Sequence, residues 1–167
     1  GLFRQIQLDD VAAMPAQAMP IHATALNVTN ASLPFGAKPE EFFLIVGRMT
    51  PGKGIAEAIS IAKKADVPLL IVGHVTSHLP CSRAYFETEV KPHIDGVRIK
   101  HVQRLPRRDL LAVMSRARGF LFPLQWDEPF GMAVVESMAA GAPVLAYARG
   151  SMPELIEPGR SGFLVDD

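Results

Sequence analysis

Residues 42–73 read FFLIVGRMTPGKGIAEAISIAKKADVPLLIVG and contain the alternation that decides the fold. Two short apolar runs, 42–47 and 68–73, each end in glycine, which is typical of strands buried on both faces of a sheet. Between them, small and apolar residues recur at helical spacing over 55–62. The stretch therefore predicts a strand, a loop, a helix and a second strand.

The same alternation continues to the end of the chain. After a helix expected over 82–91, where Pro92 would end it, the predicted strands are 97–102, 119–124, 143–148 and 162–165. Further helices are expected over 107–117, over 131–141 with Gly141 as C-terminal cap, and after Ser151, which stands at capping-box spacing from Glu154. These repeats predict an α/β, doubly wound, Rossmann-like parallel sheet with helices on both faces.

Composition sets the limits of this domain. Residues 1–40 carry four prolines and no sustained periodicity, so we interpret them as a linker or the remnant of a preceding domain, and 41–167 as the folded domain.

The 17 basic and 17 acidic side chains cancel, which argues against a nucleic-acid partner. The single Cys81 excludes an internal disulfide. No apolar run approaches ~18 residues, so we expect no transmembrane segment.

The loop after the first strand, GRMTPGKG (47–54), raises a question about phosphate. It matches most of the phosphate-loop pattern G-x-x-x-x-G-K-[ST], in the strand–loop–helix context that the pattern needs. Gly54, however, stands where a Ser or Thr hydroxyl would bind Mg²⁺, and Pro51 removes one backbone N–H. The loop therefore predicts phosphate binding of another kind.

A second loop, QWDEPFGMAVVE (125–136), is expected at the same edge of the sheet, because ligands of such sheets bind at the carboxyl ends of the strands. Glu128 would lie in the loop and Glu136 about a turn and a half into the following helix. The free N–H groups at the start of that helix form an anion site. Carboxylates beside it suit a ligand that carries hydroxyls and phosphate.

These two motifs, in this order and about eighty residues apart, resemble the C-terminal donor domain of retaining glycosyltransferases of family 4, the glycosyl transferases group 1. The resemblance covers residues 41–167, and its specific part is the E-x(7)-E segment with PFG inside it. It implies one half of a two-domain GT-B architecture, whose N-terminal acceptor domain residues 1–40 cannot form.

The resemblance also implies residue roles. Arg48 and Lys53 match the basic pair that binds the diphosphate of the donor, as two fixed cations that replace a metal ion. The chain contains no D-x-D motif, so we expect no metal and no cofactor. Residues 101–104 fall in the region that borders the nucleobase, a match of position alone.

The E-x(7)-E segment contributes the sugar side of the site. Glu128 matches the carboxylate that binds hydroxyls of the transferred sugar, and we assign the catalytic role to it as a positioning group rather than a covalent nucleophile. Glu136 matches the carboxylate that binds the ribose. The turn whose backbone amides approach sugar and phosphates corresponds to Phe130, Gly131 and Met132.

The implied activity is retaining, metal-independent sugar transfer from a UDP-, GDP- or ADP-sugar. The acceptor is open among glycans, lipid-linked sugars and small molecules. We expect the chain alone to bind nucleotide but to transfer sugar poorly, and the full-length enzyme to be cytoplasmic, with peripheral membrane association left open. Three alternatives stay open: a phosphate-loop NTPase, a non-catalytic sugar-nucleotide-binding module, and an epimerase or phosphorylase of the same architecture.

Other side chains have simpler interpretations. Arg48 and Lys53 could be ordinary loop charges, and Glu128 could belong to a solvated loop. Trp126 is interpreted as a packing anchor in preference to a sugar-stacking platform. His74 and His78 have a spacing that on a helix would suit a metal, but the residues between them favour a loop, where His74 would line the crevice.

Overall fold

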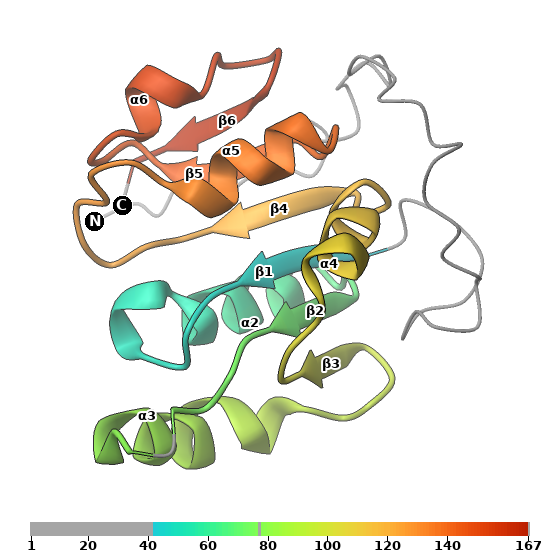
Figure 1. Cartoon of the computed structure of the whole chain (residues 1–167), viewed down its shortest axis with the longest axis vertical. Coiled ribbons are helices and arrows are strands. Elements are labelled where there is room, and N and C mark those ends of the chain that lie inside the picture. The colour runs from blue at the N-terminus through green and yellow to red at the C-terminus, as the bar shows by residue number, and fades with distance from the viewer. Residues whose placement is uncertain (1–41, 77, 167) are drawn as a thin grey trace.

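The computed structural model of the chain describes residues 42–76 and 78–166 (Figure 1). The segment 1–40, predicted as a linker or domain remnant, lies outside these residues. Six strands form one sheet in the order β3-β2-β1-β4-β5-β6, with every neighbouring pair parallel. They are β1 (Phe43–Val46), β2 (Leu69–Val72), β3 (Ile99–Val102), β4 (Gly119–Phe122), β5 (Val144–Tyr147) and β6 (Gly162–Val165).

The helices cover both faces of this sheet, which confirms the doubly wound, Rossmann-like prediction. Figure 1 shows α2 behind the sheet and α4 and α5 in front of it. The chain runs outward from β1 to β3 and then returns to β4 beside β1, so right-handed crossovers place the later helices on the other face. The helices are α2 (Ile55–Lys64), α3 (Pro80–Tyr85), α4 (Arg107–Met114), α5 (Met132–Ala139) and α6 (Met152–Leu155).

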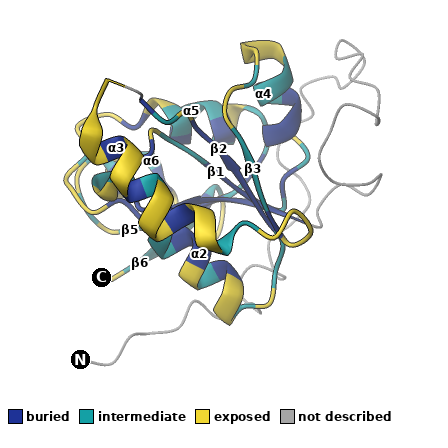
Figure 2. Ribbon diagram, turned by 90° about the horizontal axis from the view of Figure 1, so that it is seen from below, coloured by how far each residue is buried: buried dark blue, intermediate teal, exposed yellow. Residues whose placement is uncertain are grey.

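The core consists of two apolar layers, one on each side of the sheet. Along β1, Phe43 and Ile45 pack toward the layer that contains α2, and Leu44 packs toward the layer that contains α4 and α5. Successive side chains of a strand point to opposite faces, and both faces are covered, so the four inner strands of the sheet are continuous apolar runs. Figure 2 shows the buried strands between helices whose outer sides are exposed.

The segment after β2 differs from its prediction at both ends. The helix begins at Pro80 rather than near Ser82, because proline is favourable in the first turn, where its missing N–H has no partner to lose. It continues through a π-helical turn, Phe86–Val90, into a 3-10 turn, Lys91–His93. Pro92 therefore does not end the helical path at Lys91, since it occupies the first turn of the new 3-10 segment.

The predicted cap of α6 is wrong. Ser151 has helical dihedral angles and makes no side-chain capping hydrogen bond to the helix. Its hydroxyl donates instead to the backbone carbonyl of Glu128, at 2.9 Å, in a different loop. By contrast, Gly141, two residues after the end of α5, has a φ of 90° and donates its N–H to the Met138 carbonyl, which confirms that it closes this helix.

Within the described ranges, no helix is both long enough and apolar enough to cross a membrane.

Candidate functional site

The two loops singled out by the sequence meet at the carboxyl ends of β1 and β4. The backbone N–H of Gln125 donates to the carbonyl of Gly52 at 3.1 Å, which ties the loop after β4 to the loop after β1. Met49 belongs to the first loop, and its fully buried side chain anchors this loop to the core. A 3-10 turn, Pro51–Lys53, then leads into α2. The loops around Lys53 and Glu128 thus form one surface, as predicted.

Gly54 is required by the close approach of these loops. Its φ is +70°, in the left-handed region, and a Cβ built on it would lie 2.0 Å from the carbonyl oxygen of Pro123. A Ser or Thr, the residue that a phosphate-loop NTPase places here to bind Mg²⁺, would therefore clash with the backbone. This geometry argues against the NTPase alternative.

Lys53 and Glu128 form the central ion pair of this surface. The Lys53 ammonium lies 3.0 Å from Oε2 of Glu128, with exposed side-chain fractions of 19% and 16%. It also lies 5.0 Å from the centre of the Trp126 ring. The residues predicted for diphosphate and for sugar are thus in direct contact. Arg48 is exposed on the same loop as Lys53.

Trp126 was interpreted as a packing anchor, and this is wrong. Its side chain is 44% exposed beside the Lys53 ammonium, where the face of an indole attracts a cation. Phe130 and Met132 of the same loop are exposed as well. The sequence indicated this exposure only through the position of Trp126, which stands two residues before Glu128 in a predicted loop rather than in a strand.

The start of α5, where the sequence predicts an anion site, follows directly on the loop that carries Glu128. Gly131, with a φ of +82°, precedes the helix, and its carbonyl accepts from the N–H groups of Val134 and Val135. The N–H groups of Met132 and Ala133, which precede them in the first turn, have no acceptor inside the helix. A Cβ on Gly131 would approach a terminal methyl of Met152 at 2.7 Å, so α6 packs tightly behind the turn.

The loop that carries Glu128 is held by a contact that the sequence did not reveal. The N–H and the hydroxyl of Ser151 both donate to the Glu128 carbonyl, each at 2.9 Å. A Cβ on Gly150 would lie 2.6 Å from both the nitrogen and the oxygen of Glu128. Nothing in the local pattern identifies this partner, because it comes from the loop after β5.

Glu136 lies one turn into α5 and is paired with Arg107. Nη1 of Arg107 lies 2.8 Å from Oε1 of Glu136, whose side chain is only 20% exposed. The sequence analysis did not identify Arg107. The sequence nevertheless indicated that an acidic partner is needed here. Arg107 and Arg108 are the first residues of a helix, where the helix dipole disfavours a cation that has no such partner.

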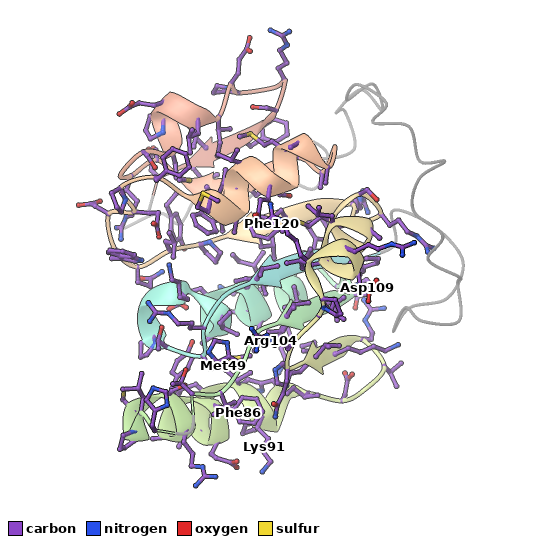
Figure 3. The ribbon with its side chains drawn as sticks, in the orientation of Figure 1. Met49, Phe86, Lys91, Arg104, Asp109 and Phe120 are labelled. Atoms are coloured by element: carbon purple, nitrogen blue, oxygen red, sulfur yellow. The ribbon has the colours of Figure 1, made fainter. Side chains whose placement is uncertain are left out.

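The region expected to border the nucleobase divides into two parts. His101 is half-buried, with Nε2 2.8 Å from the Gly73 carbonyl and its ring 5.1 Å from that of Phe86. Beyond β3, Gln103 helps to line an open hollow of about 390 Å³ with Val75, Arg83, Phe86 and Glu87. Figure 3 labels Phe86 and the exposed Arg104 in this region. The hollow is large enough for a planar heterocycle.

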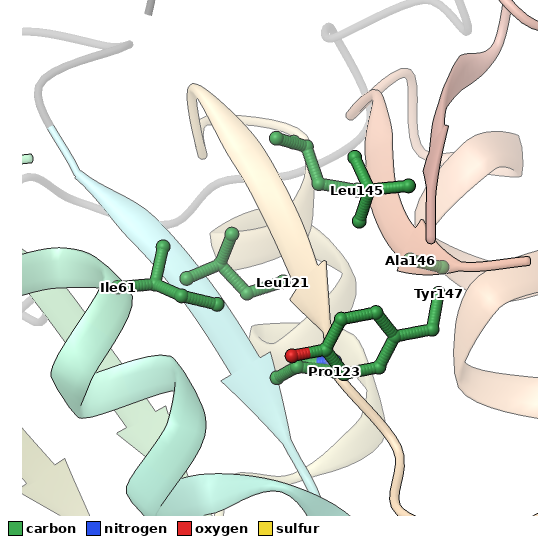
Figure 4. A pocket seen from close by; sticks show the side chains of 7 residues that line it. Ile61, Leu121, Pro123, Leu145, Ala146 and Tyr147 are labelled. Atoms are coloured by element: carbon green, nitrogen blue, oxygen red, sulfur yellow. The ribbon is translucent and has the colours of Figure 1, made fainter. Parts of the chain in front are cut away.

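A second void is too small to be a ligand site. It has a volume of about 10 Å³, the space of about one water molecule, and lies between α2, β4 and β5 (Figure 4). Its lining is mainly apolar and includes Ile61, Leu121 and Leu145. Burial raises the pKa of Tyr147, which also lines it, and the nearby Glu57 carboxylate raises that pKa further.

His74 and His78 lie in the irregular segment between β2 and α3, and both are exposed, so the loop interpretation is confirmed. In the part of the chain that the structure describes, no three His, Cys, Asp or Glu side chains gather into a possible metal site.

Comparison with known proteins gives the family. The glycosyl transferases group 1 family matches residues 34–167. A D-inositol 3-phosphate glycosyltransferase from Corynebacterium efficiens is 29% identical over 151 residues, which are 86% of this chain and 34% of that protein. The chain spans about a third of the length of curated relatives that it matches.

Solved structures show the same fold in larger glycosyltransferases. Sucrose-phosphate synthase from Thermosynechococcus elongatus is 30% identical, with a TM-score of 0.68, over 82% of this chain and 35% of that one. Anabaena HepE, in a complex with UDP-glucose, is 26% identical with a TM-score of 0.60, over 76% of this chain and 35% of that one. With a match over most of its length, the chain belongs to the glycosyl transferases group 1 family, and its fold is that of GT-B glycosyltransferases.

Proposed function

We propose that this chain is the donor-binding part of a retaining, metal-independent glycosyltransferase that uses a nucleoside-diphosphate sugar. The observation that carries the proposal is the Lys53–Glu128 pair beside the N-terminus of α5. A cation and free backbone N–H groups suit a diphosphate, and a carboxylate suits sugar hydroxyls. The UDP-glucose complex of Anabaena HepE, on the same fold, supports a donor of this class.

Each side chain then has a role in the departure of the leaving group. The bond between the anomeric carbon and the diphosphate oxygen breaks, and its electron pair leaves with the diphosphate. Lys53 and Arg48 stabilise that charge from fixed positions. Glu128 holds hydroxyls of the transferred sugar, Glu136 holds the ribose, and the backbone amides at Phe130, Gly131 and Met132 approach the phosphates. The acceptor hydroxyl attacks on the same face, and its proton passes to the departing phosphate oxygen.

The geometry of the first loop supports a mechanism without a metal ion. Gly54 leaves no room for the hydroxyl that would bind Mg²⁺ in a phosphate-loop NTPase, so the loop offers charge from side chains instead. The hollow beside Phe86 and Gln103 is our candidate for the nucleobase, at the carboxyl end of β3.

Thermal unfolding with UDP, GDP, ADP and ATP, each with Mg²⁺ and with EDTA, tests this proposal. At about 100 times the dissociation constant, a bound nucleotide adds about 2.7 kcal/mol of stability, or about 5–10 °C in Tm for a chain of this size. We expect a shift with one nucleoside diphosphate in EDTA, abolished in Lys53→Ala and retained in Lys63→Ala at the far, exposed end of α2. A shift with ATP only in Mg²⁺ would overturn the proposal.

A further inference from the structure

Arg107 is placed to act on Glu136 from a neighbouring helix. It is the first residue of α4, directly after the β3–α4 loop, while Glu136 lies in the middle of α5. The two helices pack side by side on the same face of the sheet (Figure 1). Their contact is between Nη1 of Arg107 and Oε1 of Glu136, at 2.8 Å.

Stability alone does not account for this ion pair. Arg107 is 72% exposed, and pairs that involve such exposed side chains contribute little to folding. Its charge also lies at the positive end of α4, where the helix dipole disfavours a cation. The partner differs, because the side chain of Glu136 is only 20% exposed.

The contact engages one oxygen of the carboxylate. A carboxylate has about four acceptor positions over its two oxygens, and the ion pair joins Oε1 to a single guanidinium nitrogen. The other oxygen remains a potential acceptor for two neighbouring hydroxyls. The contact through Oε1 limits the orientations that the Glu136 side chain adopts, and this restricts where such hydroxyls can bind.

We propose that Arg107 is a positioning residue that orients Glu136 toward the ribose hydroxyls of the donor. The proposal rests on the proposed function, since it assigns the ribose to Glu136. Arg107 itself touches neither sugar nor phosphate in this scheme. It sets how strongly the site distinguishes a ribonucleotide from its 2′-deoxy counterpart, because that distinction depends on a well-placed acceptor for the 2′-hydroxyl.

The test is the ratio of two dissociation constants, measured by calorimetry on the 167-residue chain with UDP and 2′-deoxy-UDP. If the unfolding experiment selects GDP or ADP, that pair of nucleotides is used. We expect the chain to prefer the ribonucleotide about tenfold, the range of a hydrogen bond to a charged acceptor. Arg107→Ala and Glu136→Gln should each lower the ratio to about 3 or less. Arg108→Ala, the adjacent exposed arginine, should leave it unchanged.

Arg107→Lys separates orientation from charge. Lysine keeps the positive charge but replaces the rigid guanidinium with a point charge on a flexible stem, so a positioning role predicts an intermediate ratio. If Lys restores the full ratio, or if Arg107→Ala and Arg108→Ala lower it equally, general electrostatics explains the result and the proposal is overturned. Should Arg107→Ala fail to fold, as judged by its Tm, Arg107→Gln serves in its place.

Failure of this inference is distinguishable from failure of the proposed function. If the unchanged chain binds no nucleoside diphosphate, both the proposed function and the role of Arg107 are overturned. Binding that is lost in Lys53→Ala, but with the same ribose preference in the unchanged chain and in Arg107→Ala, would remove the role of Arg107 alone. Equal affinity of the unchanged chain for UDP and 2′-deoxy-UDP would also remove it.

Discussion

Lys53 and Glu128, 75 positions apart in the sequence, form an ion pair of 3.0 Å at the meeting point of two loops. In the proposed donor site these side chains bind different parts of one ligand. The carboxylate of Glu128 therefore competes with a diphosphate for the Lys53 ammonium, and it also repels the negative charge of the diphosphate.

Glu128→Gln should consequently tighten the binding of a nucleoside diphosphate that carries no sugar. We expect an affinity about fivefold higher, because a partly exposed ion pair is worth ~1 kcal/mol or less. Binding of the corresponding sugar nucleotide should gain less, because the glutamine accepts sugar hydroxyls more weakly. Calorimetry with UDP and UDP-glucose measures both, and Asp127→Asn, the exposed neighbour, is the control. Weaker UDP binding in Glu128→Gln would contradict the competition.

Trp126 should hold the Lys53 ammonium in place. Replacing it by leucine removes the ring that lies 5.0 Å from Nζ, and we expect a two- to fivefold weaker diphosphate affinity, the size of an exposed cation–π interaction. Trp126→Phe keeps a ring and should lose less. In a double-mutant cycle, Trp126→Leu should have no further effect once Lys53 is alanine. An equal loss in both backgrounds would show that Trp126 acts independently of Lys53.

Gly54 and Gly96 allow the stability cost of a steric clash to be separated from that of backbone strain at positive φ. Their φ angles are +70° and +72°, but a Cβ at Gly54 would lie 2.0 Å from the Pro123 oxygen, and a Cβ at Gly96 would meet nothing within 4 Å. Gly96→Ala should cost about 1–2 kcal/mol through backbone strain alone. Gly54→Ala should cost clearly more, at least 3 kcal/mol, because the loops must separate. Urea unfolding measures both, and similar losses would contradict the clash.

Asp95 should make the stability of the chain depend on acid pH. One of its oxygens accepts the N–H groups of Val97, Arg98 and Ile99 at the turn before β3. Chiefly the hydrogen bond from Ile99, and then that from Val97, lower the pKa of Asp95 below its usual 3.8. Because the pKa is lower in the folded chain, the ionised form favours folding. This contribution is complete above the usual value and is lost as pH falls through the folded one.

The measurement compares the Tm of the unchanged chain with that of Asp95→Asn between pH 7 and pH 2. The difference should be constant at neutral pH and should shrink below pH 3.8. A difference that grows as the pH falls would contradict the assignment.

The fold was predictable from sequence because the four inner strands, β1, β2, β4 and β5, are short apolar runs buried on both faces of the sheet. Lys53, Glu128 and Glu136 were identified because their spacing within short motifs is local. Their partners were not, since Trp126, Arg107 and Ser151 reach them through packing of separate loops and helices. Ser151 is an example. Its spacing to Glu154 fits a helix cap, yet its hydroxyl donates a hydrogen bond to the Glu128 carbonyl in another loop. Local sequence patterns do not contain information about such a distant acceptor, which competes with the helix for the hydroxyl.

The all-parallel order of the sheet has a practical consequence for engineering. Every loop of the candidate site leaves the carboxyl end of a strand, so the turns that lead into the strands lie at the other end of the sheet. Two of these turns are exposed and contain Gly96 and Gly159, where an added side chain would meet nothing within 4 Å. Because a side chain at a positive φ is strained, fluorophores or affinity tags are better attached at the exposed neighbours Val97 and Arg160. The proposed donor binding can then be followed by a reporter at the end of the sheet opposite the candidate site.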